Sequence, residues 1–201
     1  MAIMPERTVE KSKPHFRRLR RWAFASLAAF ALLVSAAPSP VKAEDVIQAP
    51  QAFLENAFGG EPPKAQVLWL KRDLQSGIQK IMDHRLNAVR LRYWRSGERS
   101  AWILEEIGKE QPITAGFVVD KNRIMAASVL TYRESRGWEI KYPAFRNQFI
   151  GAMLEPNTYL DRNIDGISGA TMSVTAMMKM ARLALYLHSH VVAASIDGAP
   201  S

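Results

Sequence analysis

The residues best suited to chemistry lie in one loop near the end of the chain, where residues 165–171 read Asp-Gly-Ile-Ser-Gly-Ala-Thr. Glycines, a serine and an alanine stand between a carboxylate and a hydroxyl, and a segment of helical apolar spacing follows at once. This pattern is typical of a tight loop that leads into a helix N-terminus, where unpaired N–H groups and the helix dipole favour an anion such as phosphate. Glycine lets such a ligand come close, because it has no Cβ.

This loop resembles the Asp-Gly-x-Ser-Gly-Ala-Thr signature of the FMN-binding domain family, which includes flavin-carrying subunits of the sodium-pumping NADH:quinone oxidoreductase and of the Rnf complex. In that family a flavin transferase uses FAD and a divalent cation, magnesium, to join FMN through its phosphate to the last threonine. The resemblance implies covalent FMN on Thr171. The family's key positions are all present: Asp165, Gly166, Ser168, Gly169, Ala170 and Thr171. The alternative is a helix N-cap loop without a ligand, because these residue types are ordinary caps.

A second segment of the chain is similar to the family's Glu-Thr-x-Gly stretch, which lies against the flavin ring. The resemblance implies cofactor contacts from Glu134, Ser135 and Gly137, with two departures: serine replaces the commoner threonine, and Arg136 stands where familiar members have proline. The Ser135 hydroxyl and backbone N–H groups suit the pyrimidine edge, and Arg136 suits the reduced, anionic ring. Trp138 could stack on the flavin; the alternative is a solvated loop with Trp138 in the core.

The charge of the chain is concentrated at its N-terminus. The formal net charge is +8, but residues 1–43 hold eight Lys and Arg against two acids, so residues 44–201 carry only +2. A nucleic-acid partner is therefore not predicted.

The N-terminal residues have the pattern of a secretory signal peptide, predicted to be removed at residue 43. A basic stretch from Lys11 to Arg21 precedes an apolar run from Trp22 to Ala37, and Val-Lys-Ala then stands before Glu44. The run is short for a membrane-spanning helix, so an uncleaved anchor is the alternative. The chain has no cysteine, which excludes disulfides and a lipoprotein anchor. We expect a periplasmic or otherwise extracytoplasmic protein, membrane-associated if the anchor is kept.

The remaining sequence predicts one α+β domain, an antiparallel meander with flanking helices. A lead-in covers residues 44–65, the FMN-binding domain residues 66–190, and a mobile tail residues 191–201. The expected helices are a short one near 52–58, an amphipathic one at 72–83, a short one at 143–150 and a long one from 171 to about 190. The expected strands are 89–93, 101–104, 113–119 and 124–131, with a hairpin turn at 120–123, while residues 67–70 fit a strand or a helical turn.

Two features could suggest a metal, and neither predicts one. His84 is the only histidine between Glu44 and the last helix, and it stands at the end of a predicted helix without a second ligand in view, which favours a cap or surface residue. The methionines of the last helix have helical spacing, which favours core packing over a soft-metal site. They are Met172, Met177, Met178 and Met180.

These observations favour an extracytoplasmic electron-transfer flavoprotein that exchanges electrons with a membrane-bound or periplasmic redox partner. Two alternatives stay open: a flavin-dependent reductase of a small molecule, and a non-redox module that binds flavin to regulate. No cluster of acid, base and nucleophile is evident, so a carrier is favoured over a stand-alone enzyme.

Overall fold

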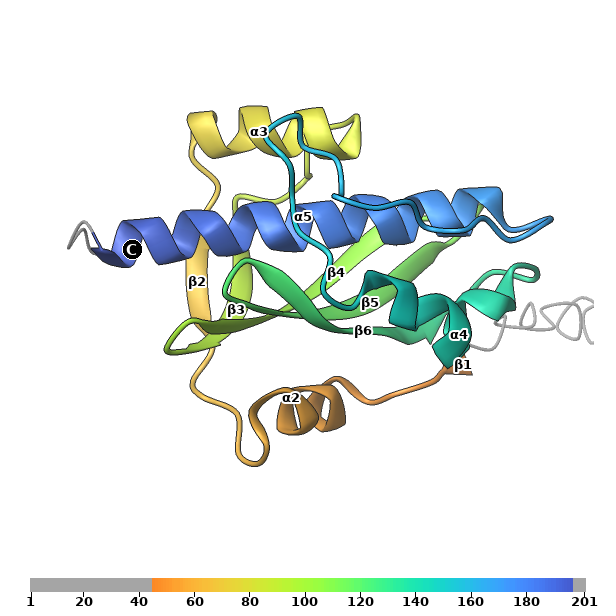
Figure 1. The fold of residues 1–201 in the computed structure, drawn as a ribbon, viewed down its shortest axis with the longest axis horizontal. Coiled ribbons are helices and arrows are strands. Elements are labelled where there is room, and N and C mark those ends of the chain that lie inside the picture. Colours follow the sequence, from red (N-terminus) through yellow and green to blue (C-terminus); the bar gives the residue numbers. More distant parts are fainter. Residues whose placement is uncertain (1–44, 197–201) are drawn as a thin grey trace, which may run out of the picture. The chain divides into compact units, whose positions relative to one another are not determined.

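The computed structural model describes residues 45–196, so the predicted signal peptide and residues 197–201 lie outside the described part. Its centre is a six-stranded sheet in which all neighbouring strands are antiparallel, in the order β1-β6-β5-β4-β3-β2 (Figure 1). The strands are β1 (Asp45–Val46), β2 (Gln66–Trp69), β3 (Arg90–Ser96), β4 (Arg99–Ile107), β5 (Pro112–Asp120) and β6 (Arg123–Tyr132). The predicted α+β class is confirmed.

The four predicted strands are the central ones, β3 to β6, each longer than expected. The two edge strands, β1 and β2, have only two and four residues, too few for a clear alternation of apolar and polar side chains. The β5–β6 hairpin turns at Lys121 and Asn122, whose φ angles of 50° and 59° match the type I′ geometry that favours a two-residue turn. The segment at residues 67–70, which fitted a strand or a helical turn, contributes to the strand β2. The sheet therefore has six strands, whereas four segments were predicted as strands without an alternative.

Helices cover both faces of this sheet (Figure 1). The long helix α5 (Thr171–Ile196) lies across one face with α3 (Arg72–Met82) packed beside it, and α2 (Pro50–Phe58) covers the other face. The larger hydrophobic core fills the space under α5 and α3, which agrees with the apolar spacing of both sequences. On the α2 side, a Cβ added to Gly116 would lie 2.6 Å from the ring of Phe53, so glycine admits that ring to the sheet.

A connecting segment leads from β6 back to α5. It contains a 3-10 helix (Trp138–Lys141), the short helix α4 (Pro143–Arg146) and a second 3-10 turn (Asn147–Phe149), in place of the single helix predicted at 143–150. Phe145 and Phe149 are both buried as expected, with ring centroids 5.5 Å apart. These two rings fix the segment against the core.

The last helix is longer than predicted. It continues to Ile196, so the first six residues of the expected mobile tail, 191–196, are helical. The sequence has neither glycine nor proline between His188 and Gly198, and Val191 is still buried. Within residues 45–196 no helix combines the length and apolar character needed to cross a membrane.

Candidate functional site

A pocket of about 520 Å³ lies where three segments distant in sequence meet. Lys109 and Glu110 come from the turn after β4, residues 134–136 from the loop after β6, and residues 169–173 from the start of α5. The two segments that sequence reasoning assigned to one ligand are therefore brought together. The turn after β4 was not predicted, because its residues match no motif that would distinguish them from any polar turn.

Close packing joins the loop after β6 to the start of α5. Gly137 has a φ of +81°, and a Cβ added there would lie 2.9 Å from the Cβ of Ala170 and 3.0 Å from the hydroxyl of Tyr132. A side chain at this position would push the two segments apart, and the left-handed backbone also favours glycine. Gly137 does not line the pocket; it allows the two walls that do so to meet.

A hydrogen-bond chain strengthens the same junction. The Tyr132 hydroxyl donates to the backbone oxygen of Arg136, and it lies 3.2 Å from the Ser173 hydroxyl. Because each hydroxyl has one proton, Ser173 must donate to Tyr132. Burial raises the pKa of Tyr132, so the phenol stays protonated. Ser173 is itself buried, and its proton is already engaged.

The glycines of the motif have different roles. The Ala170 N–H donates to the Ile167 carbonyl at 2.9 Å, which closes a turn through Ser168 and Gly169. Gly169, third in that turn, has a φ of +79°, as a type II turn requires. In the described part of the chain, no atom beyond the adjacent residues lies within 4 Å of a Cβ added at Gly166 or Gly169. Gly169 is therefore required by its backbone angle, and both positions leave the approach to the loop open.

Thr171 opens the last helix with an exposed side chain. Across residues 45–196, no acceptor is found for the backbone N–H groups of residues 171–173, and the first bond of the helix runs from the Val174 N–H to the Ala170 carbonyl at 3.0 Å. These three residues also line the pocket. The site thus offers unpaired donors and the positive end of a helix dipole beside a free hydroxyl.

Three predicted residues flank the pocket without lining it. Asp165, Gly166 and Ser168 are exposed on the loop that approaches α5, and the Asp165 N–H is held by the side-chain oxygen of Gln148 at 2.7 Å. Those that do line it are Glu134, Ser135, Gly169, Ala170 and Thr171.

Trp138 is not a core residue. It is 46% exposed and packs edge-on against Tyr142, with ring centroids 5.1 Å apart. The alternative that placed Trp138 in the core is therefore wrong. Its stacking on a flavin stays a prediction.

Glu134 faces the turn after β4. Its Oε1 accepts hydrogen bonds from three successive backbone N–H groups, those of Lys109 at 2.5 Å, Glu110 at 2.7 Å and Gln111 at 3.0 Å. That oxygen is therefore already engaged in hydrogen bonds to the protein backbone. The hydroxyl of Ser135 and the guanidinium of Arg136 are exposed at the pocket.

Residues 108–186 match the model of the FMN-binding domain family. This range includes every residue that lines the pocket. These residues are identified as an FMN-binding domain. The match supports a flavin-binding protein, in agreement with the resemblance found in the sequence. No curated protein matches the chain.

The pocket of the FMN-binding domain has the donors that FMN requires. The N–H groups of residues 171–173 suit its phosphate. Lys109 and Arg136, from the other two segments that line the pocket, add positive charge, and no ion pair is found for either among the described residues. The fit of pocket and cofactor therefore rests on backbone donors at the start of α5 and on these two cations.

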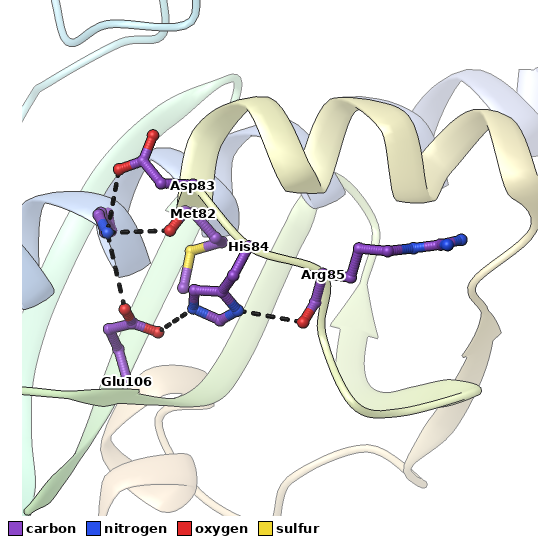
Figure 2. A network of polar contacts seen from close by, with 6 residues as sticks. Met82, Asp83, His84, Arg85 and Glu106 are labelled. Carbon is purple, nitrogen blue, oxygen red and sulfur yellow. Dashed lines mark hydrogen bonds and ion pairs between the residues drawn. The ribbon is translucent and has the colours of Figure 1, made fainter.

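A separate charged cluster surrounds His84 at the end of α3 (Figure 2). His84 Nε2 lies 2.9 Å from a Glu106 oxygen and Nδ1 lies 3.0 Å from the Arg85 carbonyl. Lys179 on α5 lies 3.0 Å from Asp83 and 3.8 Å from Glu106. Within the described residues no three His, Cys, Asp or Glu side chains are placed to hold a metal ion. His84 is a partly exposed histidine at a helix end, as expected, but it also binds β4.

Proposed function

We propose that the protein carries FMN covalently, with the cofactor's phosphate esterified to the hydroxyl of Thr171. The observation that supports this most directly is the position of Thr171. Its exposed side chain opens α5 at a pocket whose other walls come from the residues 134–136 loop and the turn after β4. The match over residues 108–186 makes flavin the ligand to expect there.

Of the three hydroxyls near the motif, Thr171 is the best acceptor. Ser173 is buried and donates to Tyr132. Ser168 is exposed, but it lies in the turn before the helix and does not line the pocket. A phosphodiester on Thr171 lies next to the unpaired N–H groups of the first helical turn, a placement worth about 0.3–1 kcal/mol at an exposed terminus.

The attachment needs a flavin transferase, with FAD as donor and magnesium as the cation. The Thr171 oxygen forms a bond to the phosphorus next to the riboflavin half of FAD, the pyrophosphate P–O bond breaks, and AMP leaves. The hydroxyl proton passes to the transferase or to solvent. The chain's own contribution is to hold Thr171 exposed at the end of a glycine turn that leaves the approach free.

We further propose that the protein works as an extracytoplasmic electron carrier between a membrane-bound partner and a second redox partner. Bound FMN supplies the redox chemistry. Among residues 45–196, the charged side chains that line the pocket are Lys109, Glu110, Glu134 and Arg136, and no histidine or tyrosine from this range lines it to serve a substrate as acid or base. A tether suits such a carrier because it gives the flavin an effective concentration of order millimolar where free flavin is dilute.

Co-expression with a flavin transferase in the presence of magnesium tests the covalent link. We expect the intact mass to rise by one FMN less one water, and the band to fluoresce under ultraviolet light after denaturing electrophoresis. Thr171→Ala should abolish both signals, Thr171→Ser should retain some labelling, and the control Ser168→Ala should still be labelled. Full labelling of Thr171→Ala would move the site elsewhere, and an unlabelled wild type would refute the covalent flavoprotein.

A further inference from the structure

The turn after β4 is held by a side chain that comes much later in the chain. Three successive N–H groups converge on one carboxylate oxygen of Glu134. The turn is closed by the Gly108 N–H, which donates to the Gln111 carbonyl at 3.0 Å, and a Cβ added at Gly108 would lie 2.8 Å from the same carboxylate oxygen. Successive N–H groups in a turn form an anion-binding concavity, and hydrogen bonds to a charged acceptor are stronger than neutral ones.

The contact between Glu134 and this turn sets the position of one wall of the flavin pocket. Lys109 and Glu110 belong to the turn that Glu134 holds, and both line the pocket together with the start of α5. The ammonium of Lys109 has no ion-pair partner in the described part of the chain. Its charge is therefore available to a ligand, provided that the turn is fixed.

We infer that Glu134 is a positioning residue for the flavin, which acts by holding the turn so that the Lys109 ammonium faces the cofactor. The inference rests on the proposed function, because the charge would act on FMN tethered at Thr171. A cation beside the ring stabilises the reduced, anionic flavin over the neutral oxidised form, and so raises the midpoint potential. Glu134 contributes through Lys109, since its own Oε1 is occupied by backbone donors.

Two kinds of variant separate the hydrogen bonds that anchor the turn to Glu134 from the charge of Lys109. Glu134→Ala removes the acceptor and leaves three N–H groups without it, whereas Lys109→Gln removes the ammonium and leaves the backbone bonds in place. Glu134→Gln keeps an oxygen acceptor without its charge, and it serves if the alanine variant folds poorly. Glu110→Gln is the matched control, because it removes the opposite charge from the same turn.

Amide hydrogen exchange of the flavin-free protein tests the anchor. We expect residues 109–111 to exchange faster in Glu134→Ala than in the wild type, with Glu134→Gln in between. Exchange in Lys109→Gln and Glu110→Gln should be unchanged. Unchanged exchange in Glu134→Ala would overturn the inference.

Redox titration of the flavin-loaded proteins tests the route through Lys109. Lys109→Gln should lower the midpoint potential, more at low salt than at high salt, and Glu110→Gln should raise it. Glu134→Ala also removes a carboxylate from the pocket, so it should raise the potential less in the wild type than in the Lys109→Gln background, because only the wild type then loses the placement of the Lys109 charge. Additive shifts would overturn the inference. Failure of the proposed function is distinguishable, since it would show as a wild type that takes up no flavin.

Discussion

The two ends of α5 handle polar groups differently. At the start of the helix, the N–H groups of residues 171–173 find no acceptor across residues 45–196 and face a pocket. Near the other end, His188 is only 1% exposed, and its Nδ1 lies 2.8 Å from the hydroxyl of Ser100. The indole N–H of Trp102 donates to that same hydroxyl at 2.8 Å. Polar groups at the first end are left for a ligand, and those at the second are paired within the core.

The pairing at the second end suits a neutral histidine. Because the Trp102 indole can only donate, the Ser100 hydroxyl accepts from it and keeps its own proton for Nδ1 of a neutral His188. Burial, and after it the positive charge of Arg95, lowers the pKa of His188 to about 4. Changes at the start of α5 should therefore affect flavin attachment, and changes near its other end should affect stability.

The largest effect we expect is a loss of stability in acid that originates at His188. In the unfolded chain the histidine binds a proton below its ordinary pKa of 6.5, whereas the folded protein resists protonation until about pH 4. Stability is thus fully present above pH 6.5 and falls as the pH drops toward 4, by about 3 kcal/mol for a shift of this size. Urea unfolding between pH 7 and pH 4 measures it.

The matched control is the next histidine on the same helix, the exposed His190. His190→Gln should keep the acid dependence, and His188→Leu should remove most of it. Both variants should take up flavin at pH 7 as the wild type does. If the stability of His188→Leu still falls in acid as that of the wild type does, groups other than His188 cause the acid dependence. If His188→Leu no longer takes up flavin, the two ends of α5 do not act separately.

The sequence predicted the backbone at the start of α5 better than the contacts near its other end. The turn and the helix start could be predicted because the glycines and the threonine are contiguous, so the geometry follows from local backbone preferences. The sequence predicted that residue 188 lies in the last helix, but not which residue contacts the side chain of His188. Ser100 lies on β4, 88 residues earlier, and nothing local in either segment indicates the other.

The same limit explains the remaining differences. Lys109 and Glu110 line the pocket, and the Glu134 side chain that accepts hydrogen bonds from their turn lies 23 to 25 residues later in the chain. The edge strand β1 is defined by its pairing with β6, since two residues carry no periodic signal. The end of α5 was placed too early because burial of Val191 continues the helix beyond the motif-bearing region. Each missed feature depends on a long-range contact.

A smaller effect on stability is expected from the glycines at the flavin end. Gly169→Ala places a Cβ on a residue with φ of +79°, which costs about 1–2 kcal/mol although no atom lies near it. Gly166→Ala is the matched control, because it also has open space and no left-handed backbone angle. We expect flavin labelling to fall strongly in Gly169→Ala, out of proportion to its stability, and to persist in Gly166→Ala. Equal labelling of the two variants would show that the turn geometry is not needed.

The smallest effect should come from the charged cluster around His84 (Figure 2), which contacts α5 through Lys179. Both ring nitrogens of His84 face acceptors, the Arg85 carbonyl and the Glu106 carboxylate, so both must carry protons to bond. The Arg85 carbonyl and then Glu106 raise the pKa of His84 above 6.5. This is the opposite of His188, where the neutral form is favoured.

The sign of the pH dependence is therefore reversed at His84. Its stabilisation is fully present below pH 6.5 and is lost as the pH rises through the raised pKa. The side chain is 48% exposed, so solvent screening should keep the contribution under about 1 kcal/mol. Urea unfolding of the wild type and His84→Gln from pH 6 to pH 9 should show a stability difference that shrinks with rising pH. A difference that grows with pH would mean that the neutral ring is the favoured form. In that case His84 would favour the neutral form, as the buried His188 does. The two acceptors around His84 would then not raise its pKa, and the proposed contrast between the two histidines would be wrong.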